Sequence, residues 1–248
     1  MNSLPALLCL VVSVAWIGTP SANAQQPPTG PTPLVHTPPD GSCWTVEIQY
    51  QGTPHHNEAA GPSRSPGSFP AHTNSVPTRV EKLIGKNHIQ QTTITYADNH
   101  SSRFYLSDDY ILQKYDHSEK IAVFPAETSD PKNGIFDTLR GKSFPGIDWL
   151  TLKNYEGVEI VKQQACYKFH IPGNTNTDKP GLELQAWIRI VDHYPQQIQI
   201  GNTHYLFSEV TPYSQNIQLS AAYQDALSHI QSEMRAIGAL NQNQANHK

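Results

Sequence analysis

Histidines that could bind a metal ion are scattered along this chain without the spacing that a metal site requires. The sequence contains 12 histidines, and His36, His55, His56 and His72 lie in stretches rich in proline. Zinc sites place their ligands at short, fixed separations on ordered elements. These four histidines have no such spacing, so we expect no bound metal and no cofactor.

Carboxylates are the next candidates for chemistry. Asp108 and Asp109 are adjacent, and Asp148 is a third candidate acid. Paired aspartates between two β-like segments are typical of a turn. The sequence also lacks a nucleophile elbow, a phosphate-binding loop, a His-Glu-x-x-His pair and a Cys-x-x-Cys pair. We therefore expect no catalytic residues, and a hydrolase of unrecognised type is the less favoured alternative.

The N-terminus has the pattern of a secretory signal peptide. An apolar run spans residues 7–17, and Ala22-Asn23-Ala24 follows it as a cleavage signal. The alternative is a membrane anchor, but the run is well short of the ~20 apolar residues that cross a bilayer. We predict a signal peptide over residues 1–24, a periplasmic or secreted protein, and no transmembrane segment after cleavage.

Charge argues against one class of partner. The formal net charge is −4 and 15% of the residues are charged. A mildly acidic protein does not attract the phosphate backbone. We expect no binding to nucleic acid.

Cysteine usage suggests a disulfide. Only Cys43 and Cys166 remain after cleavage at Ala24. Two thiols in an oxidising compartment are usually paired. In their strands both cysteines alternate with the large apolar residues, so both thiols leave the sheet on its polar side. We predict a Cys43–Cys166 disulfide, with two buried unpaired thiols as the alternative.

Proline and polar residues divide the chain. We predict a Pro-rich linker over residues 25–41, a single domain over 42–240 that contains a mobile loop at 52–77, and a polar tail at 241–248.

Strand patterns fill most of that domain. In residues 43–50, Trp44, Val46, Ile48 and Tyr50 alternate with polar residues, as in a strand with one wet face. Further β-like segments span residues 89–96, 103–106, 110–115, 121–124, 158–161, 165–171, 182–191, 196–200 and 204–210. Their short turn-forming connections predict an antiparallel meander.

Two segments depart from this strand rhythm. Residues 130–148 are punctuated by proline and glycine and leave room for one short helical turn. Residues 217–238 carry apolar residues at helical spacing, so we predict one amphipathic helix of about 20 residues that ends near Gly238. We expect Tyr223, Leu227, Ile230 and Met234 to face the sheet.

In the predicted strands the large apolar side chains occupy alternate positions, so they lie on one face of the sheet. If the sheet is curved and does not fill its own interior, part of this apolar face is left uncovered. An uncovered apolar patch is a candidate binding site. The candidate ligand-binding residues are Trp44, Ile48, Tyr50, Phe104, Tyr167 and Phe169. The alternative is that they form an ordinary core.

The later half of the chain resembles bacterial LolA/LolB-like exported proteins, the carriers of outer-membrane lipoproteins. The resemblance lies in residues 144–149, 154–159 and 166–169, and in Trp187-Ile188 followed by an acidic residue, a turn to Pro195 and a returning strand. With the upstream meander it covers residues 43–210. Arg189 departs from the family pattern, which favours Asp there, and no functional residue carries over.

The resemblance implies an α+β fold that is mainly antiparallel β: a curved sheet forming an incomplete (half) β-barrel, with a C-terminal amphipathic helix. It implies a non-enzymatic protein that binds an apolar ligand, a lipid or a lipoprotein acyl chain, on the concave face. The competing hypothesis is a structural or protein-interaction module of the cell envelope with an envelope protein as partner.

Overall fold

The computed structural model describes residues 34–51, 76–114, 120–126, 141–173 and 181–245. The predicted signal peptide, most of the predicted linker and loop, and the end of the tail lie outside these residues. The strands are β1 (Ser42–Tyr50), β2 (Pro77–Ile84), β3 (Gln90–Tyr96), β4 (Ser101–Ser107), β5 (Tyr110–Lys114), β6 (Ile121–Pro125), β7 (Tyr155–Val161), β8 (Gln164–Ile171), β9 (Leu184–Arg189), β10 (Pro195–Ile200), β11 (Thr203–Phe207) and β12 (Thr211–Pro212). A 3-10 turn, η3 (Leu152–Asn154), precedes β7, and one helix, α1 (Ala221–Ala245), ends the described chain.

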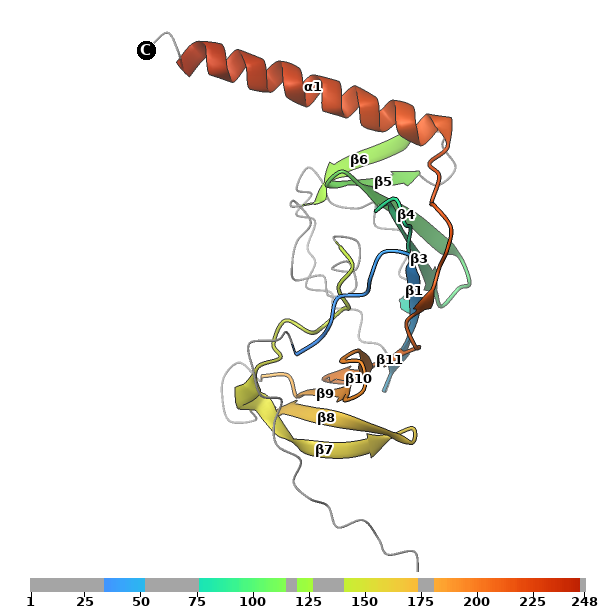
Figure 1. The fold of residues 1–248 in the computed structure, drawn as a ribbon, viewed down its shortest axis with the longest axis vertical. Coiled ribbons are helices and arrows are strands. Elements are labelled where there is room, and N and C mark those ends of the chain that lie inside the picture. Colours follow the sequence, from blue (N-terminus) through green and yellow to red (C-terminus); the bar gives the residue numbers. More distant parts are fainter. Residues whose placement is uncertain (1–33, 52–75, 115–119, 127–140, 174–180, 246–248) are drawn as a thin grey trace, which may run out of the picture.

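The strands form one large antiparallel sheet. Their order is β6-β5-β4-β3-β2-β1-β11-β10-β9-β8-β7, and β12 pairs with the start of β1. In Figure 1 the strands follow one another along an arc, with β6 near one end and β7 at the other. The predicted antiparallel meander is confirmed on both sides of β1, because β2 to β6 and β7 to β11 each pair with their neighbours in sequence.

The first strand joins these two meanders. β1 pairs with β2 on one side, where Val46 lies opposite Val80, and with β11 on the other, where Val46 lies opposite Phe207. The β1–β11 pair joins residues about 160 positions apart in the sequence. The two halves of the sheet therefore become one surface only through this long-range pairing.

Tight turns connect the neighbouring strands. Asp108 and Asp109 both have positive φ, 48° and 65°, between β4 and β5, and Lys162 and Gln163 do the same between β7 and β8. Two successive residues with positive φ are the mark of the hairpin turn whose twist matches the flanking strands. The paired aspartates are therefore turn residues, as their sequence context predicts.

The sequence analysis assigns no strand to the residues of β2, whose first residue, Pro77, is the last of the predicted loop. The strand begins at Pro77 and has Arg79, Glu81 and Lys82 among its residues. The sequence pattern of this strand is weak, because Lys82 interrupts the alternating apolar positions to which Val80 and Ile84 belong. Proline at the first position is compatible with a strand, since the missing N–H falls at its start.

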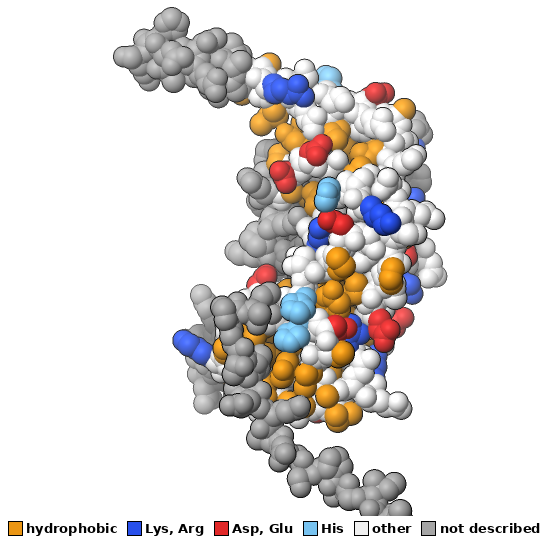
Figure 2. Space-filling model, in the orientation of Figure 1, with side chains coloured by type: hydrophobic (Ala, Val, Ile, Leu, Met, Phe, Trp, Pro, Cys, Tyr) orange, Lys and Arg blue, Asp and Glu red, His pale blue; other side chains and the backbone are white. Residues whose placement is uncertain are grey.

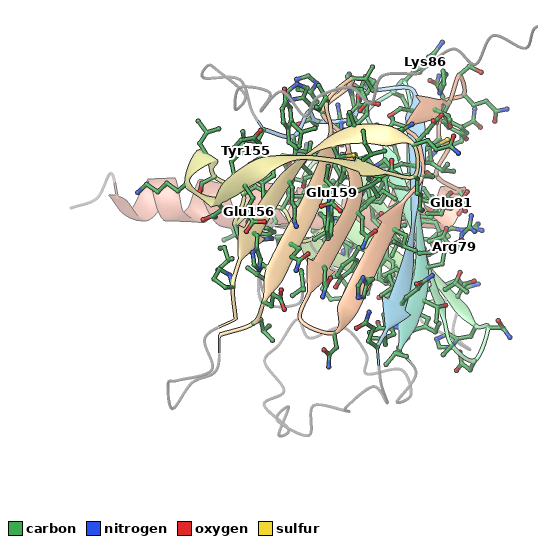
Figure 3. All side chains as sticks on the ribbon, turned by 90° about the horizontal axis from the view of Figure 1, so that it is seen from below. Arg79, Glu81, Lys86, Tyr155, Glu156 and Glu159 are labelled. Carbon is green, nitrogen blue, oxygen red and sulfur yellow. The ribbon has the colours of Figure 1, made fainter. Side chains whose placement is uncertain are left out.

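The sheet has two unlike faces. We call inner the face that carries Trp44, Val46 and Ile48, and outer the face that carries Thr45 and Glu47. Residues that pair across neighbouring strands lie on the same face of the sheet. Arg79 of β2 lies opposite Glu47, and Glu81 lies opposite Thr45, so these residues are on the outer face (Figure 3). Residues 34–41 and 141–151 lie within the arc, on the inner side (Figure 1).

The helix packs on the outer face at the β6 end of the sheet. Leu227 and the half-buried Tyr223 of α1 contact Leu112, Tyr105 and neighbouring apolar residues, a second and smaller core. The rings of Tyr105 and Tyr223 are 5.0 Å apart. No helix in the described part of the chain is both long and apolar enough to cross a membrane.

Two details of the predicted helix are wrong. It starts at Ala221 and continues past Gly238 to Ala245, while Ile217 and Leu219 precede it in an extended segment that already contacts the sheet. Met234 is 51% exposed and does not pack. The apolar stripe is longer than the sheet beneath it, and α1 runs out beyond β6 in Figure 1.

The predicted disulfide is also wrong. Cys43 and Cys166 are both free, and β11, β10 and β9 separate their strands. Four strand spacings correspond to about 19 Å along the sheet, whereas a disulfide needs Cα atoms less than about 7 Å apart. Instead, Cys43 Sγ lies 3.1 Å from the Thr211 hydroxyl, and burial raises the pKa of the Cys166 thiol to about 11.

Candidate functional site

The six candidate ligand-binding residues come together on the inner face. Trp44, Ile48, Phe104 and Phe169 are buried, with exposed fractions of 1, 5, 3 and 0%. Tyr50 and Tyr167 are half-buried against the same apolar cluster. They come from β1, β4 and β8, so the register of the sheet unites them. We call this the inner cluster.

Tyr50 is the polar member of the inner cluster. Its hydroxyl donates a hydrogen bond to the Pro77 carbonyl at 2.8 Å. Burial, and secondarily the nearby Tyr205, raise the pKa of Tyr50 to about 12. The phenol is therefore neutral at physiological pH, and its hydrogen bond ties β1 to the start of β2.

Phe144 covers the inner cluster from the irregular segment 141–151. Its ring lies 4.9 Å from Trp44, 5.5 Å from Phe207 and 5.9 Å from Tyr194. Only 3% of Phe144 is exposed, and Ile147, Trp149 and Leu150 of the same segment pack on the cluster as well. The inner face is thus covered by a piece of chain with neither helix nor strand.

The covering segment is held by its own hydrogen bonds and by one glycine. Trp149 Nε1 donates to the Gly146 carbonyl at 2.8 Å, and the Leu150 N–H donates to the Ile147 carbonyl at 3.0 Å. Gly146 has φ +71°, and a Cβ there would lie 2.7 Å from a methyl group of Ile200. Both the turn and the close approach to β10 require glycine.

A second segment, residues 34–41, lies beside the first. Leu34 and Val35 pack on the inner cluster, so this end of the predicted linker is part of the core. Lys142 binds Asp40 at 2.6 Å and joins the two segments. The hydrogen bond from Lys142 holds the pKa of Asp40 below its usual range.

The expectation of an uncovered apolar interior is therefore wrong for the centre of the sheet. Segments 34–41 and 141–151 take the place that an open half-barrel would leave empty. On the side of the molecule seen in Figure 2, hydrophobic side chains instead gather in patches along the sheet, with polar and charged side chains between them.

Sequence reasoning missed a buried amine on the inner face. Lys82 of β2 is fully buried, and its Nζ donates a hydrogen bond to the Thr92 hydroxyl at 3.0 Å. Burial lowers the pKa of Lys82 to about 7. Because Lys82 alternates in phase with Val80 and Ile84, the sequence contains a signal for an inward-facing lysine once residues 77–84 are read as a strand.

Other polar side chains lie on the inner face of β3, β4 and β5. Gln90 and Thr92 come from β3, Ser102 from β4 and Gln113 from β5, and all four are buried. Lys82 lies opposite Thr92, and Phe104 lies between Thr92 and Gln113 in the register. We call Lys82, Gln90, Thr92, Ser102 and Gln113 the inner polar patch.

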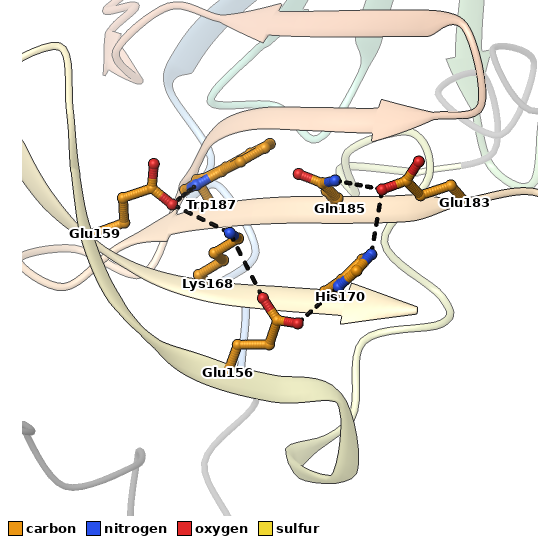
Figure 4. A network of polar contacts seen from close by, with 7 residues as sticks. All are labelled: Glu156, Glu159, Lys168, His170, Glu183, Gln185 and Trp187. Atoms are coloured by element: carbon orange, nitrogen blue, oxygen red, sulfur yellow. Dashed lines mark hydrogen bonds and ion pairs between the residues drawn. The ribbon is translucent and has the colours of Figure 1, made fainter. Parts of the chain in front are cut away.

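The outer face carries an ionic network at the β7 edge (Figure 4). Glu156 contacts both Lys168, at 3.5 Å, and His170, at 2.6 Å. The contacts Glu159–Lys168, Glu159–Trp187, His170–Glu183 and Glu183–Gln185 complete it. The hydrogen bond from His170 lowers the pKa of Glu156.

This network is structural in character. Its carboxylates are more than 40% exposed, and exposed ion pairs stabilise a protein by at most ~1 kcal/mol each. It fastens the edge strand β7 to β8 and β9. Within the described part of the chain, no group of three or more His, Cys, Asp or Glu is arranged to hold a metal ion.

Comparisons with known proteins give only distant likenesses. No protein-family model and no curated protein matches the sequence. The chain is similar in structure to the lipoprotein LppX from Mycobacterium tuberculosis, with 14% identity, a TM-score of 0.36 and coverage of 73% of this chain and 90% of that one. It is also similar to a LolA superfamily protein, NE2245 from Nitrosomonas europaea, with 9% identity, a TM-score of 0.34 and coverage of 76% and 92%.

A third similar structure is a DUF1329 family protein from Desulfovibrio piger, with 11% identity, a TM-score of 0.28 and coverage of 74% and 89%. Because all three TM-scores lie below 0.5, the proposals that follow rest on the site itself.

Proposed function

We propose that this chain is a non-enzymatic exported protein that binds an apolar ligand, a lipid or a lipoprotein acyl chain, on the inner face of a half-barrel. The observation that supports it best is the way the inner cluster is covered. Phe144 reaches into an aromatic surface from an irregular segment, and such segments open at lower free-energy cost than sheet strands. A ligand would take the place of Phe144.

The inner cluster has the chemistry for such a ligand. Its buried members are aromatic or aliphatic side chains contributed by both halves of the sheet. Apolar surface of this kind holds acyl chains by removing them from water, without directional bonds. Residues 34–35 and 144–150 supply comparable apolar contacts to the inner cluster in this structure.

Burial is the observation against an enzyme. Lys82 and Thr92 are the residue types of an amine base and a hydroxyl nucleophile, and they are hydrogen-bonded. Their exposed fractions are only 0 and 2%, so a hydrolytic water does not reach them in this conformation.

The experiment is a titration with a fluorescent fatty acid, cis-parinaric acid. We expect micromolar binding by the wild type and tighter binding by Phe144→Ala, because the ligand then no longer competes with the ring for the same apolar surface. Leu152→Ala is the matched control, since Leu152 is 49% exposed and lies outside the inner cluster. It should bind like the wild type.

Failure of both the folded wild type and folded Phe144→Ala to bind the probe would refute the proposal. Near-ultraviolet circular dichroism reports whether each variant is folded. Should Phe144→Ala fail to fold, Phe144→Leu provides the same comparison with a smaller loss of packing. Phe169→Asp is unsuitable, because Phe169 is fully buried in the sheet.

A second candidate function is an interaction module of the envelope, and the far half of α1 favours it. Met234 and Ile237 are each 51% exposed on a helix that extends beyond the sheet (Figure 1). Exposed apolar residues on a projecting helix can dock a partner. Pull-down of a defined envelope protein by the wild type, lost in Met234→Lys, would support it.

A further inference from the structure

The strand β7 ends the sheet on one side. Among the described residues no strand pairs with its far edge, whereas at the other end of the sheet α1 lies alongside β6 (Figure 1). In Figure 3, which is seen from below, β7 is the nearest strand and carries Glu156 and Glu159. An end strand presents unpaired backbone groups, which can pair with a strand of another chain.

One printed hydrogen bond fixes which backbone groups of β7 face its open edge. The Ala165 carbonyl of β8 accepts a hydrogen bond from the Ile190 N–H, so it points away from β7. Backbone groups of successive strand residues point to opposite sides, so those of the next residue of β8 point toward β7, where that residue lies opposite Glu159. Val158 and Ile160, on either side of Glu159, therefore turn their N–H and C=O groups to the open edge.

The side chains along this edge are apolar on one face and acidic on the other. Val158 lies opposite Tyr167 of the inner cluster and Ile160 lies opposite Ala165, so both are on the inner face. Ile160 is 66% exposed. Glu159 lies between them on the outer face. Edge strands usually avoid large exposed apolar side chains, so the exposure of Ile160 favours a surface that another chain covers.

The outer side of the edge has an excess of negative charge (Figure 4). The three carboxylates Glu156, Glu159 and Glu183 share two cationic side chains, Lys168 and His170. One carboxylate charge is therefore unbalanced even when His170 is protonated. Complementary charge selects partners at protein interfaces, so a basic side chain is favoured opposite this face.

The available edge is short. A register shift between Tyr155 and Gly157 interrupts the pairing of β7 near its start, and the hairpin turn at Lys162 and Gln163 ends it. Bulges and short strands limit edge-to-edge pairing between whole sheets. A short extended segment fits this edge better than the edge of a second sheet does.

A second copy of this chain is the poorer occupant. The antiparallel register that uses the free backbone groups of both Val158 and Ile160 places Glu159 directly opposite the same residue of the copy. Like charges directly opposite one another destabilise a strand pair. The charge at Glu159 thus favours a different partner.

We propose that the β7 edge binds an extended segment of another protein, which adds a strand antiparallel to β7. In this segment a lysine or arginine lies opposite Glu159, between two apolar residues that lie opposite Val158 and Ile160. The backbone groups of Val158 and Ile160 supply the hydrogen bonds, and the side chains on the two faces supply the specificity. This site is separate from the apolar-ligand site and does not depend on it.

Two labelled peptides of equal length test the charge pairing. One has the central sequence Val-Lys-Val and the other Val-Glu-Val, each flanked by threonine, and fluorescence anisotropy measures their binding. We expect the wild type to bind the lysine peptide about fivefold more tightly, as for one cross-strand charge pair. Glu159→Lys should reverse this preference. An equal preference in the wild type and folded Glu159→Lys would overturn the proposal.

Ile160→Pro tests the backbone pairing. Proline lacks the N–H that faces the open edge, and an edge strand tolerates proline where the sheet does not use that N–H. We expect Ile160→Pro to bind the lysine peptide about tenfold more weakly. Ile160→Val is the matched control, because it keeps the N–H and an apolar side chain, and it should bind like the wild type. Far-ultraviolet circular dichroism reports whether each variant is folded, and the Glu159→Lys test stands whether or not Ile160→Pro folds.

Failure of the folded wild type to bind either peptide would overturn the proposal, as would equal binding by folded Ile160→Pro and Ile160→Val. A wild-type dimer in sedimentation that Ile160→Pro abolishes would show that a second copy occupies the edge, and would overturn the choice of partner. Ile160 lies outside the inner cluster, so cis-parinaric acid should bind Ile160→Pro as it binds the wild type. Failure of the edge site and failure of the apolar-ligand site are therefore distinguishable.

Discussion

Lys82→Met should stabilise the protein in a pH-dependent way. In the folded state Lys82 is fully buried and burial lowers its pKa from 10.5 to about 7. Between these values the unfolded chain holds a proton that the folded chain does not, so the free energy of unfolding of the wild type rises with pH, by up to ~1.4 kcal/mol per pH unit. Below pH 7 Lys82 is protonated in both the folded and the unfolded wild type, so the wild type bears the full free-energy cost of burying the charged amine.

Methionine has a similar length and no charge, so this cost disappears in the variant. We expect the stabilisation of Lys82→Met over the wild type to be larger at pH 7 than at pH 9 by about 2 to 3 kcal/mol. The loss of the hydrogen bond to Thr92 is a constant offset that does not alter this difference.

Urea unfolding followed by tryptophan fluorescence at pH 7, 8 and 9 measures the effect. Lys86→Met is the control for the substitution itself, since Lys86 is an exposed lysine just after β2. If the gain from Lys82→Met is the same at pH 7 and pH 9, Lys82 does not titrate in this interval in the folded protein, and the reasoning from burial is wrong.

Three further outcomes are expected. Removing residues 232–248 should change the free energy of unfolding by less than ~0.5 kcal/mol, because Met234 and Ile237, which are lost, are each 51% exposed. Leu227→Ala should cost about 2 to 3 kcal/mol, and thermal unfolding distinguishes the two variants. Because both cysteines are free, dithiothreitol should leave the melting temperature unchanged. The buried Cys166 should react with a thiol reagent only after unfolding, whereas Cys43 should react in the folded protein. A Cys43–Cys166 linked peptide in a non-reducing digest would contradict both expectations. His170→Ala should destabilise by less than ~1 kcal/mol, since its carboxylate partners are exposed; a larger loss in urea unfolding would show that the network does more than fasten β7.

Apart from β2 and the short β12, the strands and their faces could be predicted from the sequence because they depend on local pattern. The alternation of Trp44, Val46 and Ile48 with polar residues identifies both β1 and its buried side, and the Asp108-Asp109 turn implies that β4 and β5 are antiparallel neighbours. Both inferences involve residues a few positions apart. The six inner residues were found in this way, although their role in binding is still a prediction.

The local sequence pattern could not predict which strands, distant from each other in the sequence, pair in the sheet. β1 pairs with β11, a contact between distant segments, and this pairing places three strands between Cys43 and Cys166. The matching phase of the two cysteines says only that both face outward. Phase is a property of one strand, whereas distance across a sheet depends on the order of all of them.

Tertiary structure also decided which apolar and charged residues are buried. The helical periodicity of α1 continues through Met234, but the sheet beneath it does not, so Met234 is exposed. Lys82 shows the reverse, since it is charged in the unfolded chain and lies on the buried side of β2. A sequence determines which side of an element a residue occupies. Whether that side meets water depends on what packs against it, and here segments 34–41 and 141–151 come to the inner face from distant parts of the chain.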